Sequence, residues 1–454
     1  MSRRLSPLAV YNSLPKKNCN ECGVPTCLAF AVKLIEGTVE LDACPHLTDQ
    51  QRNEIEQMVL PPVRKVVFGR RKTVAVGGER VLHRHELRLH NPTVIALDLD
   101  DSDQDQVIKA RLQSINKFRI ERAGQTFGID AVAVLGTSKS PDRFGKVVKT
   151  VSEDSNLPII LCSPSPEVLQ AGLEEVKDDR PILYSATAET LERFIELSKE
   201  FKCPICLTSE DLAELRAMAR KAMNEGVVIL LAPITLATSL HEALLKLVTI
   251  RRAAIEHKYQ ELGHPIIAFP ISEPHFKEEG WRNSVVASML MMRYADILVT
   301  HSLEMPLLLP VFTLRQAVYS DPRYPSSVKT GLYTYGTPDS ESPVLMTTNF
   351  ALTYYLVSGD ISSAKISSFL LVADTQGMSV LNAVVGRQLT HEVVRDLIHQ
   401  TQIEEKVTHR KLVIPGLAAR LRGDIEDATG WQVIVGPEES SEIAVFLKKT
   451  GWTV

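Results

Sequence analysis

The chain has 454 residues, a formal net charge of −4, 44% hydrophobic residues and 23% charged residues, a composition that suits a globular protein with several domains. This charge gives no electrostatic case for binding nucleic acid or an anionic membrane. The start of the chain lacks the apolar core of a secretory signal, and no apolar run approaches the roughly 18 residues that span a bilayer. We therefore expect a cytoplasmic protein whose seven cysteines stay reduced.

Four cysteines near the amino terminus have a C-x2-C-x4-C-x16-C spacing, and Pro45 follows the last of them. Four thiolates with a proline after the final one are typical of a 4Fe-4S cluster. Zinc sites more often pair two short C-x2–4-C motifs across a spacer, so zinc and unmetallated core cysteines are the weaker alternatives. We predict a small cluster domain over residues 1–60, which a metal would help to fold. Its expected ligands are Cys19, Cys22, Cys27 and Cys44.

Two segments follow the cysteine motif. Residues 49–62 are polar and end in two prolines, so they could form a hinge or a packed helix. Residues 72–89 have the pattern of a β-hairpin, for which Gly77 and Gly78 would supply the turn.

The middle of the chain alternates short apolar strands with helices, for example helices over residues 105–123 and 236–260. Eight strand–helix units in about 250 residues predict a (β/α)8, or TIM, barrel over residues 61–322. An open, doubly wound sheet is the alternative. The predicted strands, each nearly continuous in apolar residues, are residues 94–99, 131–136, 158–163, 181–185, 203–208, 227–232, 265–269 and 297–300.

The carboxyl ends of these strands, where barrel enzymes hold their active sites, show no obvious catalytic pairing. We interpret the single histidine at this edge, His301, as structural. Cys203 and Cys206 are three residues apart on one predicted strand, so they face opposite sides of it, and we interpret both as core residues. The barrel is then a scaffold or docking surface. An acidic run after the first strand could hold a cation, but a solvated loop or a helix amino terminus is the favoured reading for Asp98, Asp100, Asp101, Asp103 and Asp105.

Residues 320–343, rich in Pro, Ser, Tyr and Gly, predict a linker to a last domain over residues 323–454. Strands over residues 344–347, 368–372, 412–414 and 432–435 alternate with helices there, which predicts a three-layer, Rossmann-like α/β domain. Ligands of such sheets bind beyond the carboxyl ends of the strands. The loops at these ends are rich in glycine and hydroxyl residues, which favours a cofactor site, although such turns are also commonplace. No G-x-G-x-x-G or P-loop motif supports a nucleotide there.

Three stretches of the chain are specific enough to indicate a family: residues 16–31 (KKNCNECGVPTCLAFA), 347–355 (TTNFALTYY) and 430–437 (GWQVIVGP). With these stretches, the whole chain resembles the large (gamma) subunit family of the corrinoid iron-sulfur protein, which serves the acetyl-CoA decarbonylase/synthase, or Wood–Ljungdahl, system of anaerobes. The resemblance implies an amino-terminal 4Fe-4S cluster, a central TIM barrel, and a last domain that holds a corrinoid against a smaller partner subunit in a heterodimer.

The resemblance also implies a function in methyl transfer, with no catalytic residue. The Co(I) corrinoid would accept a methyl group from methyltetrahydrofolate through a separate methyltransferase. It would then donate the methyl group to the nickel site of acetyl-CoA synthase, which works with CO dehydrogenase. The cluster would return an electron to cobalt that has been oxidised to Co(II).

The chain has no D-x-H-x-x-G motif, and His391, His399 and His409 lie on predicted helices or their ends. We therefore expect a base-off corrinoid with no lower ligand from the protein. Thr375 matches the family position beneath cobalt. The residues that the resemblance places at the corrinoid are Thr347, Thr348, Asn349, Asp374, Thr375, Gly377, Met378, Ser379, Gly416, Gly436 and Pro437.

Two other functions fit parts of the sequence. One is an enzyme, either a methyltransferase whose barrel binds the pterin or a reductive activator of another corrinoid protein. The other is an iron-sulfur scaffold, for which the isolated complex would contain no corrinoid.

Overall fold

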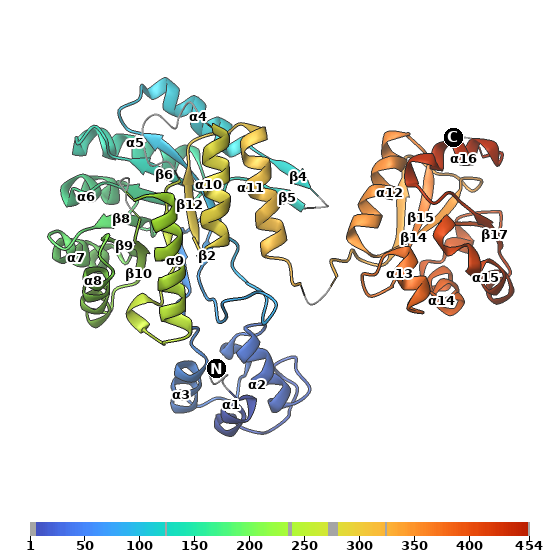
Figure 1. Cartoon of the computed structure of the whole chain (residues 1–454), viewed down its shortest axis with the longest axis horizontal. Helices are drawn as coiled ribbons and strands as arrows, with labels where there is room; N and C mark the ends of the chain where they lie inside the picture. The colour runs from blue at the N-terminus through green and yellow to red at the C-terminus, as the bar shows by residue number, and fades with distance from the viewer. Residues whose placement is uncertain (1–5, 123–124, 235–237, 271–279, 323–324, 453–454) are drawn as a thin grey trace. The chain divides into compact units, whose positions relative to one another are not determined.

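The computed structural model describes residues 6–122, 125–234, 238–270, 280–322 and 325–452. The chain divides into two compact units, one made of residues 1–120 and 127–320 and the other of residues 121–126 and 321–454. The first unit contains an amino-terminal helical domain and a barrel, and the second contains a separate sheet covered by helices (Figure 1). In the described part of the chain, no helix is long and apolar enough to cross a bilayer.

The amino-terminal domain consists of α1 (Pro7–Ser13), α2 (Cys27–Glu36), a short 3-10 helix (Leu41–Ala43) and α3 (Asp49–Val59). Local signals set the helix limits. Thr26 caps the start of α2 and Gly37 ends it in the left-handed conformation, while Thr48 and Gln51 form a capping box on α3. The segment that could have been a hinge is thus a helix, and it packs because Ile55 is buried with Val10, Phe30 and Leu34.

A β-hairpin precedes the barrel, but both its bounds and its turn differ from the prediction over residues 72–89. Strands β1 (Val66–Phe68) and β2 (Val74–Val76) pair antiparallel, so the turn lies at residues 69–73 and Gly77 comes after it. Gly77 has φ +74°, and a Cβ there would lie 2.2 Å from the carbonyl oxygen of Arg64. This glycine is therefore needed for close backbone packing. Apolar side chains of the hairpin join the interior core of the barrel.

Eight parallel strands form the barrel, in the order β10-β9-β8-β7-β6-β3-β12-β11. A bridge between Leu231 and Ile266 joins the two ends of this order, so the sheet closes and the open-sheet alternative is wrong. All eight predicted strands are confirmed: β3 (Val94–Asp100), β6 (Ala131–Leu135), β7 (Ile159–Cys162), β8 (Ile182–Ala186), β9 (Ile205–Thr208), β10 (Ile229–Ala232), β11 (Ile267–Ala268) and β12 (Ile297–Thr300).

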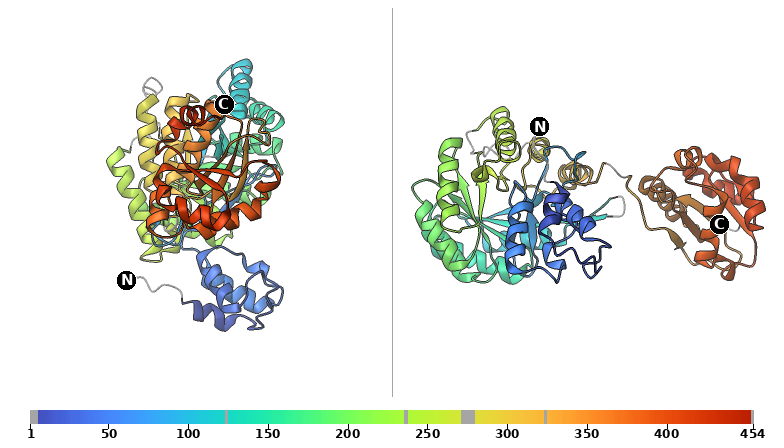
Figure 2. Two further views of the ribbon diagram at one scale, coloured as in Figure 1. Left: turned by 90° about the vertical axis from the view of Figure 1, so that its right-hand side faces the viewer. Right: turned by 90° about the horizontal axis from the view of Figure 1, so that it is seen from below.

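Helices surround the ring of strands, as the end-on view in Figure 2 shows. Because side chains alternate along a strand, Ala96 packs in the interior and Leu97 packs outward against the helices. The helix predicted over residues 105–123 is too long, since α4 ends at Lys117 and the strand pair β4 (Ile120–Arg122) and β5 (Gln125–Phe127) follows it. The outer helices are α4 (Asp105–Lys117), α5 (Pro141–Asp154), α6 (Pro166–Glu175), α7 (Leu191–Phe201), α8 (Leu212–Asn224), α9 (Leu240–Ile255), α10 (Gly280–Met292) and α11 (Met305–Val318).

The second unit is a five-stranded mixed sheet with the order β13-β15-β14-β16-β17. Strand β13 (Gly331–Tyr335) runs antiparallel at one edge, so part of the predicted linker belongs to the sheet and the domain is not fully Rossmann-like. Separate apolar cores on the two faces make three layers. The other strands, all parallel, are β14 (Val344–Thr348), β15 (Ser368–Ala373), β16 (Lys411–Ile414) and β17 (Gln432–Val435). The helices are α12 (Ala351–Ser363), α13 (Val380–Val385), α14 (His391–Thr401), α15 (Arg422–Thr429) and α16 (Ile443–Lys449).

Candidate functional site

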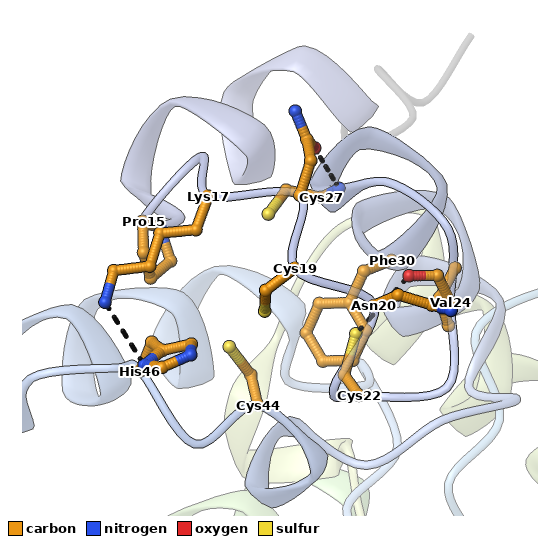
Figure 3. A pocket seen from close by; sticks show the side chains of 11 residues that line it. Pro15, Lys17, Cys19, Asn20, Cys22, Val24, Cys27, Phe30, Cys44 and His46 are labelled. Carbon is orange, nitrogen blue, oxygen red and sulfur yellow. Dashed lines mark hydrogen bonds between the residues drawn. The ribbon is translucent and has the colours of Figure 1, made fainter.

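The four cysteines of the motif line one hollow in the amino-terminal domain. In Figure 3 their side chains converge on this space from three segments. Cys19 and Cys22 come from the loop before α2, Cys27 is the first residue of α2, and Cys44 follows the 3-10 helix. The structure therefore brings together all four residues that the spacing predicted as ligands.

The loop that carries Cys19 and Cys22 is shaped by residues in the left-handed conformation. Asn18, Asn20 and Gly23 have φ values of +49°, +63° and +74°, which these residue types tolerate well. The Asn18 side-chain oxygen accepts a hydrogen bond of 2.8 Å from the backbone N–H of Cys27, and the N–H of Gly23 donates to the carbonyl of Asn20 at 3.0 Å. The first of these bonds ties the loop to the start of α2, and the second closes the turn between Asn20 and Gly23.

Exposure differs among the four cysteines. Cys19 is exposed, Cys22 and Cys27 are half-buried, and Cys44 is buried. Burial raises the pKa of the Cys44 thiol, and the nearby cysteines raise it further. A bound metal would offset this because it stabilises the thiolate form and releases the proton.

The sulfur atoms of the four cysteines are not grouped as closely as a single zinc ion would need. A tetrahedral zinc with Zn–S bonds of about 2.3 Å would draw its sulfurs to within about 4 Å of one another. Among the described residues, three donor atoms within 4.8 Å of one another occur at Cys19, Glu21 and His46, and not at any three of the cysteines. A cubane spreads its thiolates more widely, because each thiolate binds a different iron.

Sequence reasoning missed three charged or polar neighbours of the cysteines. The Lys17 Nζ lies 3.2 Å from Nδ1 of His46, and His46 Nε2 lies 3.0 Å from a carboxylate oxygen of Glu21. Their one signal in the sequence is that each stands within two residues of a cysteine of the motif.

The predicted corrinoid contacts lie at one edge of the second unit. Strands β14 to β17 are parallel, so the loops after them meet at the same edge. Thr347 and Thr348 end β14, both are buried, and their hydroxyl oxygens have no hydrogen-bond partner within the described structure. Buried hydroxyls without partners are unusual, and a ligand could satisfy them.

Asn349 connects two of these loops. Its side-chain oxygen accepts hydrogen bonds from the backbone N–H groups of Thr375 and Gly377, each at 3.0 Å, and its Nδ2 donates to Asp374 at 3.1 Å. The hydroxyl of Thr375 lies 2.9 Å from the same Asn349 oxygen and 2.8 Å from the carbonyl oxygen of Met378. Thr375 is thus fully buried within the turn.

The other two loops are also joined. The N–H of Gly416 donates to the carbonyl of Pro437 at 2.9 Å, and the N–H of Gly436 donates to the carbonyl of Ile414 at 2.8 Å. A Cβ on Gly416 would lie 2.9 Å from the backbone nitrogen of Glu438, so only glycine permits this approach. Met378 and Ser379 are half-buried just before α13.

The three histidines of this domain lie outside these loops. His391 begins α14 and His399 lies in its last turn. His409 precedes β16, at the amino end of that strand, and its Nε2 lies 3.0 Å from the carbonyl oxygen of Ser342. None of these three histidines is therefore on the strand-end loops that carry the predicted corrinoid contacts.

The acidic run at the end of β3 agrees only in part with the prediction of a solvated loop or helix amino terminus. Asp103 is exposed and Asp105 lies in the first turn of α4, but Asp98 and Asp101 are bonded within the fold. Asp98 accepts a hydrogen bond of 2.8 Å from Arg111 and lies 2.7 Å from Nδ1 of His301. Asp101 is fully buried and accepts a 2.7 Å bond from the N–H of Ser138. Hydrogen bonds from Lys146 and Arg143 lower the pKa of Asp105 to about 2. The run ties neighbouring barrel units together, and His301 takes part through its contact with Asp98.

Cys203 and Cys206 are core residues, as predicted. Cys206 packs in the barrel interior and Cys203 packs in the layer between strands and helices. Burial raises the pKa of Cys203 to about 12, which suits an inert thiol.

Comparison with known proteins places the chain in a family. A family model described as "CO dehydrogenase/acetyl-CoA synthase delta subunit" matches residues 65–447, and one described as "Putative Fe-S cluster" matches residues 14–46. The acetyl-CoA decarbonylase/synthase complex subunit gamma of Methanopyrus kandleri is 41% identical over 99% of this chain and 98% of that protein. The chain belongs to this gamma-subunit family.

A second relative carries the name of a corrinoid protein. The corrinoid/iron-sulfur protein large subunit of Moorella thermoacetica is 37% identical, over 98% of each chain. Among solved structures, the chain is similar to dihydropteroate synthase from Thermus thermophilus, with 15% identity and a TM-score of 0.39 over 56% of this chain and 100% of that one. The enzyme from Vibrio fischeri gives 12% identity and a TM-score of 0.40, over 57% of this chain and 99% of that one.

Proposed function

We propose that this chain is the methyl-carrying large subunit of a corrinoid iron-sulfur protein. It would pass a methyl group from methyltetrahydrofolate, delivered by a separate methyltransferase, to the nickel site of acetyl-CoA synthase. The observation that carries the proposal is the full-length likeness to the corrinoid/iron-sulfur large subunit of Moorella thermoacetica, joined to a hollow lined by four cysteines. In this proposal residues 1–60 hold the cluster, residues 61–322 are a scaffold, and residues 323–454 hold the corrinoid.

The cysteine hollow supports a role in electron transfer. Four thiolates of graded burial would hold a 4Fe-4S cluster, with Cys44 on the buried side and Cys19 on the exposed side. Electrons would enter and leave on the side of Cys19, because the other side is covered by Phe30 and its apolar neighbours. The proposed task of the cluster is to return one electron to cobalt after accidental oxidation.

The strand-end loops of the second unit support a corrinoid site. A bound corrinoid would supply the nucleophilic cobalt that accepts and releases the methyl group. The chain would contribute the unpartnered hydroxyls of Thr347 and Thr348 and the close backbone approach at Gly377 and Gly416. Only the family resemblance would assign Thr375 to the corrinoid, since its hydroxyl is held within its own loop.

The proposed partners are a small subunit that completes the heterodimer, the methyltransferase, and acetyl-CoA synthase with CO dehydrogenase. The gamma-subunit relatives carry the name of an acetyl-CoA decarbonylase/synthase complex, which supports the last of these. A pterin-binding barrel is less well supported, because Asp98 and Asp101 at the strand ends are already bonded to Arg111 and Ser138.

Metal analysis and EPR on the anaerobically purified heterodimer test the proposal. We expect about four iron and one cobalt per heterodimer, and a base-off Co(II) signal that disappears on low-potential reduction. Iron without cobalt would reject the methyl carrier in favour of an iron-sulfur scaffold. Methyl transfer from free methyltetrahydrofolate by this subunit alone would favour the methyltransferase.

A further inference from the structure

A chain of three side chains borders the exposed side of the cysteine hollow. Lys17 and His46 both line the hollow, and Figure 3 shows the contact between them. The Lys17 Nζ lies 3.2 Å from His46 Nδ1, and His46 Nε2 lies 3.0 Å from Glu21. One fixed positive charge and one fixed negative charge thus stand at the two ends of a single imidazole ring.

This chain of contacts is close to one cluster ligand. The donor atoms of Cys19, Glu21 and His46 all lie within 4.8 Å of one another. The imidazole and the carboxylate therefore stand next to the Cys19 sulfur, and the Lys17 ammonium is one hydrogen bond further away.

The hydrogen-bond direction in the chain follows from the donors available. A lysine ammonium can only donate, so His46 accepts at Nδ1. The remaining ring proton is then on Nε2, from which it is donated to the Glu21 carboxylate. His46 holds both charged groups in place in this arrangement.

We propose that Lys17 and Glu21 form an opposed pair of charges that sets the reduction potential of the cluster, with His46 as the positioning residue between them. This inference rests on the proposed function, because it needs the cluster. Reduction adds one electron, taken from an external low-potential donor, to a group that is already negative. A nearby cation favours the reduced form and a nearby anion opposes it.

The test compares Lys17→Met and Glu21→Gln in the heterodimer by EPR-monitored redox titration at low ionic strength. At the midpoint potential of the wild type, the ratio of reduced to oxidised cluster should fall about threefold in Lys17→Met and rise about threefold in Glu21→Gln. For a one-electron couple, in which a tenfold change in ratio is about 59 mV, threefold is about 28 mV. The double variant should return close to the wild-type ratio.

A neighbouring lysine provides a matched control. Lys16 is exposed and its Nζ lies 5.4 Å from the ring centroid of Tyr11 rather than on His46. Lys16→Met removes the same charge one residue away and should leave the ratio within about 1.5-fold of wild type. The effects of Lys17→Met and Glu21→Gln should also shrink in high salt, because both side chains are exposed enough to be screened.

A charge pair predicts that the midpoint potential of the cluster shifts in opposite directions in Lys17→Met and Glu21→Gln. Shifts in the same direction, or a Lys16→Met effect as large as that of Lys17→Met, would overturn the inference. If Lys17→Met loses its cluster, the same redox titration is carried out on Lys17→Gln, which removes the same charge but keeps a polar side chain. Iron content and the visible spectrum are measured in every sample, so a wild type without a cluster counts against the proposed function and not against this inference.

Discussion

Asn349 and Thr375, 26 residues apart, join the ends of two neighbouring parallel strands. The Asn349 side-chain oxygen receives the Thr375 backbone N–H at 3.0 Å and lies 2.9 Å from the Thr375 hydroxyl. The same oxygen also accepts the N–H of Gly377. The Asn349 side chain therefore shapes the loop that follows β15, and the proposed corrinoid contacts at the end of this strand lie on that loop.

Asn349→Ala should destabilise this domain and weaken corrinoid retention. The substitution leaves two backbone N–H groups buried without an acceptor, which costs about 1–3 kcal/mol. Urea denaturation and the cobalt content of the purified heterodimer measure the two effects. Asn382→Ala, on the exposed side of α13, is the control and should match the wild type in both. Equal losses in the two variants would argue against a special role for Asn349.

Gly416→Ala should also destabilise the domain, whereas Gly423→Ala should not. An added Cβ at Gly416 would lie 2.9 Å from backbone and side-chain atoms of Glu438, but at Gly423 it would meet nothing within 4 Å. Gly423 lies in α15, where alanine is the better helix former by up to about 1 kcal/mol. The midpoint temperature of thermal unfolding should therefore fall for Gly416→Ala and stay level or rise for Gly423→Ala. If Gly416→Ala unfolds at the same temperature as the wild type, the loops that contain Gly416 and Gly436 must be able to move apart.

Cys44→Ala should lower the iron content of the purified protein well below about four per chain, because each thiolate of a cubane binds its own iron. Cys203→Ala removes another buried cysteine, in the outer core of the barrel, and should retain the full iron content. Iron analysis and the visible spectrum of anaerobic samples distinguish the two. Full iron in Cys44→Ala would exclude it as a ligand.

Barrel stability should fall as the pH is lowered below about 6.5, in part because of His264. Burial lowers the pKa of His264 in the folded protein to about 3, so the unfolded chain binds the proton more tightly. The stability that the barrel has above the pKa of His264 in the unfolded chain is therefore lost as the pH falls toward the pKa of His264 in the folded protein. At pH 5.5 this loss is about 1.4 kcal/mol.

The urea midpoint measured at pH 7.5, 6.5 and 5.5 tests this dependence. His264→Gln has no group that titrates in this range, so its midpoint should vary less with pH than that of the wild type. His257→Gln is the control, since His257 is exposed and should leave the pH dependence unchanged. A wild type and a His264→Gln variant with parallel pH profiles would contradict the prediction.

Much of the barrel could be predicted from the sequence because each strand–helix unit has its own apolar pattern within a short stretch of chain. Each strand–helix unit buries its own apolar residues, so β6 and β9 were visible as short apolar runs before helices. The cysteine motif is local in the same sense, since three ligands lie within one loop and helix start. For the strand-end loops of the last domain, the sequence predicted that they meet, because parallel strands share one carboxyl edge.

Other features depended on partners that no local pattern reveals. The sequence pattern places strand β13 in a linker, because its position at the sheet edge is set by pairing with β15, 33 to 41 residues later. The sequence gives no sign of the contact that Asp98 makes, because its partner His301 is 203 residues away. The contact of Lys17 with His46 likewise spans 29 residues. Spacing in the sequence determined which residues can bind metal and form barrel units, and only the folded chain decided which charges face each other, because those contacts are made after distant segments have packed.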